Sequence, residues 1–560
     1  MLPMFSVPQR ALVAFLRGDL GESVQLSRGG GPLSGSAKAW PPPRQRGGQR
    51  MAVNAAPEER GMVSEEVAPL LVARTLGAFD LIVIFVGIVL FITNSASLQF
   101  AGPSLFVYWP ISFVTFLITG AFVTAQLGRM FPEEGSIYVW THKALGPFWG
   151  FFAGFVAWWP GPIVMVLAGT LVVTFLQQIG NFLDQKWLTE NWQQGIVILA
   201  VVWFSAAISI LRMRLTQNYV NFQFIFYTAA IFLMGLAGLA WLWKGNPAAN
   251  SFATGWNPLA GDTIVFGIPA LLTAYSFCVL ALLGIEVPLN MGVEVKSENA
   301  IKRYLLWGTV IVMAAYLWTS LGNMLAVPLA KNDATTGGAQ AVGIAFGDGL
   351  GIVVAFILMW FFLTASAVYN YSFARLLFVS GLERRFPHQI GRVNRNKVPA
   401  NAVILQTVLA SILTIVVFFI IGEASKLDPH KPYLALLAAV TIVWCISTGL
   451  LFLDIFFAKK ANPQRFEQAR RVPEWFLYLC GAVGALANAA AVFFVFVGQW
   501  STDFFPKLSE WNTWLLIMTG VAIVVGVGIY VISELTHRRP VAVLAAESKS
   551  AAPTGGAEGE

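Results

Sequence analysis

Glu286 lies between Gly284 and Pro288 in the stretch LALLGIEVPLN, and its carboxyl is the clearest candidate for chemistry in this sequence. Gly and Pro both interrupt helices, and the surrounding run from Ile264 is apolar. An acid near the centre of a membrane span costs about 2.5–3.5 kcal/mol to insert, so such a residue marks a functional site by default. Glu286 is either a proton carrier or a structural acid that hydrogen-bonds a neighbouring helix.

A second polar interruption follows Ile92, where the apolar run gives way to Thr93, Asn94, Ser95, Ala96 and Ser97. Their hydroxyl and amide side chains compete for backbone hydrogen bonds and loosen a helix. The segment is either a break inside a span or a polar helix end at the outer surface. A pair of interrupted spans at matching positions in two halves of a chain is typical of the binding site of an inverted-repeat transporter.

The composition predicts that these residues lie in a membrane. Of 560 residues, 57% are hydrophobic and 12% are charged, about half the charged fraction of a soluble protein. Cys278, Cys445 and Cys480 lie inside apolar runs, which argues against a disulfide framework. The four histidines fall in separate loops, so neither a metal site nor a cofactor is predicted.

Runs of about 20 apolar residues, long enough to cross a bilayer as helices, predict an all-α membrane protein with twelve transmembrane helices. The predicted spans are 77–98, 108–131, 146–178, 193–211, 217–243, 264–291, 304–326, 346–380, 400–421, 433–457, 475–498 and 512–535.

Basic residues fix the predicted orientation. The loops that follow even-numbered spans hold all the arginines of the connecting loops, whereas the loops that follow odd-numbered spans carry lysines alone. Loops rich in Lys and Arg stay in the cytoplasm, so both termini are predicted there, in a multi-pass protein of the plasma (inner) membrane. The same distribution accounts for the net charge of +7 without a nucleic-acid partner.

The segments follow from these spans. Residues 1–76 are predicted to be a cytoplasmic tail, with translation expected to start at Met51 and residues 1–50 lying upstream. Residues 77–243 hold spans one to five, 264–457 hold spans six to ten, and 475–535 hold spans eleven and twelve. Residues 536–560, rich in Ala, Gly, Glu and Ser, predict a disordered cytoplasmic tail.

Three motifs in order resemble the amino acid–polyamine–organocation (APC) superfamily of permeases. GIEVPLNMGVEVKSENAIKRYLLWG is similar to their sixth span and the loop after it, and MFPEEGSIYVWTHKALGPFWGFFAGF to their link between spans two and three. ASAVYNYSFARLLFVSGLERRFPHQIGRVNRNKVPANAVIL looks like their eighth span. The resemblance covers roughly residues 77–460. It implies a five-plus-five inverted repeat with broken helices one and six, two further helices, and alternating access to a central site.

One departure bears on the substrate. Many members carry a Gly-Ser-Gly turn in the first span, and LFITNSAS has no glycine at this place. Glutamate:GABA antiporters of the same superfamily also lack the turn, and their EEGG link is similar to EEGS here. A standard α-amino acid held in the usual way is therefore not implied.

We expect a small amino acid or amine to lie between spans one and six. N–H groups freed at 93–97 would bind its carboxylate, since half-helix N-termini carry partial positive charge, and carbonyls near span six would accept from its ammonium. Aromatic rings would form walls and gates, each with plain packing as the alternative. The predicted substrate-binding residues are Thr93, Asn94, Ser95, Ala96, Ser97, Trp158, Phe277, Ala281, Leu282, Leu283, Gly284 and Trp444.

The coupling ion is left open between a proton and sodium. Apolar surroundings favour the neutral form of Glu286, which could bind and release a proton. Thr364 and Ser366 on span eight offer oxygens to a sodium ion. Arg375 at the cytoplasmic end of span eight is predicted to close a gate by pairing with Asp80 or Glu294, with simple snorkelling as the alternative.

The predicted function is a secondary active transporter of amino acids or related amines, either proton-coupled or an exchanger. The alternatives are a sodium-coupled symporter of the same fold and a nutrient receptor that binds without transport. An enzyme is not predicted, because no nucleophile–base pair, metal cluster or P-loop lysine lies at membrane depth. The predicted partners are the substrate, the coupling ion and the lipid bilayer.

Overall fold

The computed structural model describes residues 61–261, 269–422, 430–500 and 505–550, with the side chains of 430–434 and 537–550 excepted. The predictions for residues 1–50 and 551–560 lie outside this part of the chain. The described secondary structure is helical, apart from one parallel β-bridge between Leu76 and Val295.

The first half of the chain forms these helices: α2 (Val63–Leu71), α3 (Ala78–Val89), α4 (Thr93–Ser97), η2 (Leu98–Ser104), α5 (Leu105–Ser112), η3 (Phe113–Ile118), α6 (Thr119–Met130), α7 (Ser136–Leu145), α8 (Pro147–Trp158), α9 (Pro160–Phe182), α10 (Asn191–Ser209) and α11 (Met213–Trp243). The second half forms η5 (Ala270–Leu272), α12 (Thr273–Leu282), η6 (Val287–Glu294), α13 (Glu298–Ala326), η7 (Leu329–Lys331), α14 (Gly337–Phe346), α15 (Asp348–Leu382), η8 (His388–Gly391), α16 (Ala400–Thr414), η9 (Ile415–Ile421), α18 (His430–Ala461), α19 (Pro463–Ala469), α20 (Glu474–Gly498) and α21 (Leu508–Ser550).

Eleven helical stretches of the described chain are long and apolar enough to cross a membrane. The first, Ala78–Met130, has 53 residues. At 1.5 Å per residue it would reach about 80 Å, more than twice the thickness of a hydrocarbon core. Gly102 interrupts this stretch with a positive φ of 58°, in the region that separates the predicted spans one and two.

The other spans lie close to their predicted bounds. Helix α21 continues through residues 537–550. The stretch PEEGSIYVWTHK, between the second and third predicted spans, contains α7, whose residues from Ser136 to Thr141 are buried.

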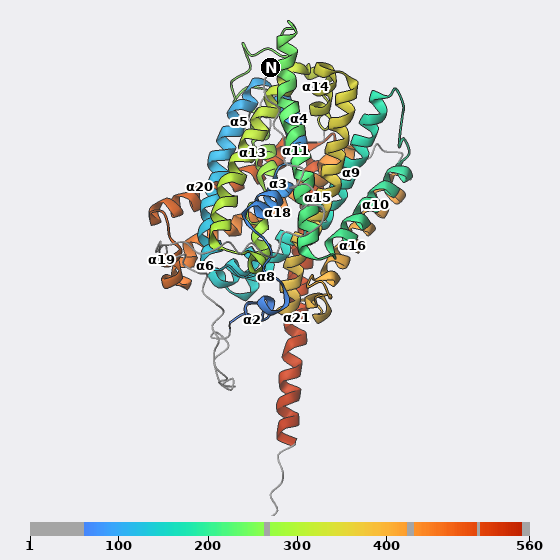
Figure 1. The fold of residues 1–560 in the computed structure, drawn as a ribbon. Coiled ribbons are helices and arrows are strands. Elements are labelled where there is room, and N and C mark those ends of the chain that lie inside the picture. The colour runs from blue at the N-terminus through green and yellow to red at the C-terminus, as the bar shows by residue number, and fades with distance from the viewer. Residues whose placement is uncertain (1–60, 262–268, 423–429, 501–504, 551–560) are drawn as a thin grey trace, which may run out of the picture. The chain divides into compact units, whose positions relative to one another are not determined.

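The first broken span is enclosed by helices from both halves of the chain. Figure 1 shows α3 in the middle of the bundle, and α11, α13 and α15 pack against it. The α3 side chains are buried almost all round, as expected of a helix that contacts protein rather than lipid. Any backbone group that α3 or its continuation leaves unpaired must therefore find a partner among these helices.

Glycines allow α11 and α13 to approach each other closely. A Cβ at Gly322 of α13 would lie 2.2 Å from the Met234 carbonyl oxygen and 2.7 Å from Gly235 Cα. Small residues at such contacts let two helix backbones meet in a membrane. This contact holds α11 and α13, which both reach the first broken span, in fixed positions.

Replacing Gly322 with alanine should lower the stability of the fold by about 1–3 kcal/mol, because the added methyl group meets backbone atoms that cannot give way singly. The measurement is the melting temperature of the purified protein in detergent. Gly520→Ala on α21 is the matched control, since a Cβ there meets nothing within 4 Å. Equal melting temperatures for the two variants would contradict this account of the α11–α13 contact.

Candidate functional site

Span one is interrupted, three residues before the predicted place. Helix α3 ends at Val89, and α4 begins at Thr93. Leu90 between them has φ −91° and ψ 70°, which is not helical. Residues Leu90–Ile92 therefore form the break, with helix on both sides.

Span six is interrupted at the residues that precede Glu286. Helix α12 ends at Leu282, Leu283 is extended, and Gly284 has a φ of 105°. A side chain at Gly284 would be strained by that φ, and its Cβ would lie 2.5 Å from Ile88 of α3 and 3.0 Å from Trp444 of α18. Glycine is thus required here both by the backbone conformation and by the close approach of the two broken spans.

Tyrosine hydroxyls satisfy the backbone groups that the breaks set free. Tyr227 of α11 donates to the Leu90 carbonyl at 2.5 Å and accepts from the Ile92 amide at 3.3 Å. One phenol thus joins both sides of the break in span one. Because hydrocarbon supplies no hydrogen bonds, a partner of this kind is needed for a break at membrane depth.

Tyr316 of α13 connects the two breaks. Its hydroxyl oxygen lies 2.9 Å from the Val89 carbonyl oxygen, 3.3 Å from that of Phe91 and 3.2 Å from that of Ala281. The Asn94 side chain also hydrogen-bonds this hydroxyl. A phenol has one proton to donate, so it serves one of the three carbonyls at a time.

Two more tyrosines extend the pattern. Tyr369 of α15 donates to the Ile88 carbonyl at 2.9 Å, and Tyr304 of α13 donates to the Ile285 carbonyl at 3.2 Å. The sequence analysis missed all four tyrosines. The available signal was a phenol inside an apolar span, since a buried hydroxyl must find a hydrogen-bond partner.

The predicted role of residues 93–97 as free N–H donors is wrong in part. The Asn94 and Ser95 amides donate to the Phe91 and Ile92 carbonyls, because the segment forms the short helix α4 rather than an unwound strand. Ser97 donates to the Ala334 carbonyl at 2.6 Å, and Ala96 accepts from Asn332 at 3.0 Å. These residues join the break in span one to the segment that precedes α14.

Glu286 is buried, with 1% of its surface exposed, and it lies at the second break as predicted. Trp444 donates to its Oε1 at 3.3 Å, and Oε2 has no hydrogen-bond partner among the described residues. Trp444 also packs edge-on against Tyr369, with ring centroids 6.2 Å apart. The predicted residues Ala281, Leu282, Leu283, Gly284 and Trp444 therefore share one region with Glu286 and the tyrosines.

Two predicted aromatic residues have other partners. Phe277 stacks on Trp500 with ring centroids 4.0 Å apart, one and a half turns of helix before the break. Trp158 donates to Gln406 at 2.9 Å, and Gln406 in turn reaches the Tyr369 carbonyl at 3.4 Å. Phe277 therefore packs away from the break, and Trp158 touches the site through Gln406.

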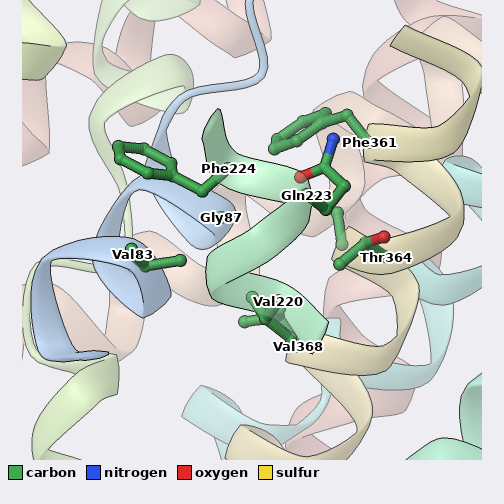
Figure 2. Close-up of a pocket in the computed structure, with 9 residues that line it drawn as sticks. Val83, Gly87, Val220, Gln223, Phe224, Phe361, Thr364 and Val368 are labelled. Carbon is green, nitrogen blue, oxygen red and sulfur yellow. The ribbon is translucent and has the colours of Figure 1, made fainter. Parts of the chain in front are cut away.

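Thr364 and Ser366 do not face one site. Thr364 lines a cavity of about 10 Å³ between α3, α11 and α15, enough for about one water, and Figure 2 shows it opposite Gln223 and Gly87. The Ser366 hydroxyl does not line this cavity and has no hydrogen-bond partner among the described residues, and the Ser366 carbonyl accepts from Ser205 of α10 at 3.0 Å. Two side chains that are two residues apart on a helix point about 200° away from each other. The predicted sodium site did not take this into account.

Arg375 is fully buried and holds two carboxylates at the end of the bundle that carries α2 and α19, here called the α2 end. It pairs with Glu294, as predicted, and its Nε lies 3.3 Å from Glu134 Oε1. The alternative partner Asp80 is wrong, because Asp80 pairs with Arg214 at 2.9 Å and accepts from Asn221 at 2.7 Å.

Glu134, the second acid beside Arg375, is fully buried. Burial and the neighbouring Glu294 raise the pKa of Glu134 to about 8, although Arg375 opposes the shift. One cation neutralises one carboxylate, so the second acid keeps its proton. We assign the ionised state to Glu294, which makes the shorter contact with Arg375.

The comparison with known proteins decides the family. Residues 76–528 match the amino acid permease family over most of the chain. The chain belongs to this family. Amino acid permeases are part of the APC superfamily and are transporters, not enzymes, as the sequence analysis predicted.

Three relatives show the range of this permease's family. Polyamine transporter PUT1 of Oryza sativa is 27% identical over 51% of this chain and 49% of the relative. The probable agmatine/putrescine antiporter AguD of Lactococcus lactis is 24% identical over 49% and 57%. The aromatic amino acid transport protein AroP of Escherichia coli K12 is 23% identical over 68% and 79%. This chain spans about half the length of the first two relatives, PUT1 and AguD.

Replacing Tyr316 with phenylalanine should destabilise this permease by about 1–3 kcal/mol, because the hydroxyl that joins the two breaks is lost while the carbonyls stay buried. The Val89 and Phe91 carbonyls keep the Phe91 and Asn94 amides as donors. Thermal unfolding in detergent measures the effect. Tyr478→Phe is the control, since the Tyr478 hydroxyl bonds the Glu474 carboxylate in a part-exposed position. A loss no larger than that of the control would show that the hydroxyl is not needed at the breaks.

The buried acid Glu134 should make stability depend on pH. Its pKa rises from 4.5 to about 8 on folding, so the folded protein holds a proton that the unfolded chain has lost. This stabilisation is complete below pH 4.5 and is lost as the pH rises to 8, at up to about 1.4 kcal/mol per pH unit.

Glu134→Gln keeps the neutral form and should flatten the pH dependence of the melting temperature between pH 5 and 8. Glu66→Gln, at an exposed position on α2, should leave that dependence unchanged. If Glu134→Gln and the parent protein lose stability in parallel, Glu134 is ionised in the folded protein.

Proposed function

We propose that this protein carries small amines, as amino acids or polyamines, across the plasma membrane by alternating access. The observation that supports this is the meeting of the Val89, Phe91 and Ala281 carbonyls around one tyrosine hydroxyl. One phenol proton leaves two of these oxygens without that donor. An ammonium group has three N–H donors and is the complementary ligand.

The charge at the site also favours an amine. Glu286 is the acid at the second break, and its Oε2 is without a hydrogen-bond partner among the described residues. Of the amides at 93–97 that would bind a carboxylate, those of Asn94 and Ser95 already donate to the Phe91 and Ile92 carbonyls. Acceptors are therefore more available than donors, a balance that suits agmatine or putrescine as well as an amino acid.

The rest of the architecture is proposed with this function. Ala78–Met130 would cross the membrane twice, divided at Gly102, so that eleven helical stretches make twelve spans. Spans one to five and six to ten would form the inverted repeat, with both termini in the cytoplasm. The α2 end would then be the cytoplasmic end, and the Arg375 pairs with Glu134 and Glu294 would keep it closed. The placement near glutamate:GABA antiporters stays a prediction.

Glu286 is proposed as the proton carrier. A neutral carboxyl tolerates burial against Trp444, whereas the ionised form would favour a hydrated or amine-bound state. A proton bound from one side and released to the other would couple the amine to the proton gradient. Sodium coupling is the rival, to be decided by experiment.

Proteoliposomes test the proposal with labelled putrescine, agmatine and a panel of amino acids, under separate proton and sodium gradients and with unlabelled solute inside. Uptake that an internal unlabelled amine accelerates would support transport. Binding without counterflow would identify a receptor instead. Acceleration by sodium alone would support the rival coupling.

Glu286→Gln should keep counterflow but lose the acceleration of uptake by a proton gradient, because the amide keeps the shape and the hydrogen bond from Trp444 but cannot carry a proton. The fluorescence of an internal pH dye, recorded with uptake, measures the coupled proton. Proton-driven uptake equal to that of the unmodified protein would reject Glu286 as the carrier. Loss of counterflow as well would indicate that Glu286 binds the amine itself.

A further inference from the structure

Asp454 is a further buried acid in the spans, at a distance along α18 from the site described above. It interrupts the apolar run TGLLFLDIFFAKK, seven residues before α18 ends at Ala461. Its side chain is fully buried, with 0% exposed. An ionisable residue in such a place is a functional candidate by default, and neither the breaks nor the Arg375 network uses it.

The surroundings of Asp454 suit a neutral acid. Among the described residues it receives one hydrogen bond, from Thr141 of α7 at 2.6 Å, and its Oδ1 has no partner. No described Lys, Arg or His nitrogen lies within 4.0 Å of its oxygens. A buried carboxylate with one donor and no cation is costly, whereas the protonated acid leaves no charge to solvate.

The neighbouring titratable groups do not supply the missing charge. On α18 and the elements packed against it they are Arg129, Tyr138, His142, Lys143, Cys445, Lys459, Lys460, Arg465, Glu467, Glu474, Tyr478, Cys480, Glu510, Tyr530 and Glu534. Most of the cations are engaged elsewhere: Arg129 with the Ala125 carbonyl, Lys143 with Glu65, Lys459 with Glu474 and Arg465 with Glu133.

His142, next to Thr141, is a base that would offset a negative charge on Asp454 if its ring were protonated. Burial, and then Lys143 and Arg385, lower the pKa of His142 to about 4. The ring is therefore neutral at physiological pH and does not offset a negative charge on Asp454.

Helix α7 connects Asp454 to the second break. The Gly135 amide donates to the Asn290 carbonyl at 2.9 Å, and the Ser136 hydroxyl lies 2.5 Å from Asn290 Oδ1. Asn290 belongs to η6, the half of span six that follows Glu286. A shift of η6 would thus move α7, and α7 carries the hydroxyl that covers Asp454.

We propose that Asp454 is a proton-binding site that controls opening of the α2 end. This proposal rests on the proposed function, because control of opening matters only if the protein is a transporter. While α7 packs against α18, Asp454 holds a proton. When η6 draws α7 away, water reaches the Asp454 carboxyl and takes up its proton. A rise in cytoplasmic pH therefore favours opening. The proton enters and leaves on the cytoplasmic side and does not drive transport.

The direct test is infrared spectroscopy of the full-length protein at neutral pH, with Asp454→Asn and Thr141→Val. Asp454→Asn should remove a carbonyl band of a protonated carboxyl. Thr141→Val should keep this band but move it, because the carboxyl loses its hydrogen bond while it keeps its proton. If Asp454→Asn removes no protonated-carboxyl band, Asp454 is ionised and only holds α7 to α18, and the proposal is overturned.

Counterflow of labelled putrescine, with equal pH on both sides of the membrane, tests the control. If opening releases one proton, its equilibrium constant changes by about tenfold per pH unit. The slope of log rate against pH should therefore be smaller in Asp454→Asn, by up to one log unit per pH unit. The acidic groups Glu133 and Glu134 contribute to both slopes, and their contribution cancels in the comparison. Equal slopes would overturn the proposal.

The two tests separate this proposal from the proposed function. A loss of the infrared band with no counterflow in any variant would reject amine transport but uphold proton binding at Asp454. Counterflow that persists, with an unchanged band and an unchanged slope, would uphold transport and reject Asp454 as the proton site.

Discussion

The need to satisfy every backbone group inside hydrocarbon is the constraint on which this structure depends. Two of the candidate membrane spans are interrupted, and hydrocarbon supplies no water to bind the freed carbonyls and amides. Tyr227, Tyr304, Tyr316 and Tyr369 supply the hydrogen bonds from helices packed around the breaks. The bundle is thus built to hold phenols at the breaks, and the glycine contact between α11 and α13 keeps two of the contributing helices in place.

The same hydrogen bonds support the proposal of an amine substrate. Carbonyl oxygens from both broken spans face the Tyr316 hydroxyl, and an acid lies at the second break. Under the proposed function, such a set offers hydrogen-bond acceptors to an ammonium donor. The Tyr316 hydroxyl would compete with that amine for the carbonyls, at a cost of no more than a few hydrogen bonds.

Much of the fold was predictable from the sequence, because the length of apolar runs is a strong signal. The interruption at Gly284 was predictable too, since a glycine and a proline flank an acid. The break in span one was misplaced because polarity, rather than backbone geometry, was the available signal. The Ser95 and Ser97 hydroxyls donate to the Ile92, Thr93 and Ala334 carbonyls. The unwound residues Leu90–Ile92, in contrast, are apolar in sequence and carry no mark of their conformation.

Partners across the bundle were harder to predict. Arg375 was expected to pair with an acid, and Glu294 was one of two choices, but Glu134 lies 241 positions earlier and was missed because its loop reads as polar surface. Thr364 and Ser366 were paired by type without regard to helical direction. Asp454 carried a readable signal, an acid in an apolar run, that the sequence analysis did not take up.

The most direct test of the central claim is a cryo-electron microscopy map of the protein with bound putrescine or agmatine. The account predicts the ammonium nitrogen within hydrogen-bond distance of the Val89, Phe91 and Ala281 carbonyl oxygens, with the Tyr316 hydroxyl moved aside. A map in which the amine binds elsewhere while the Tyr316 hydroxyl stays on these carbonyls would contradict it.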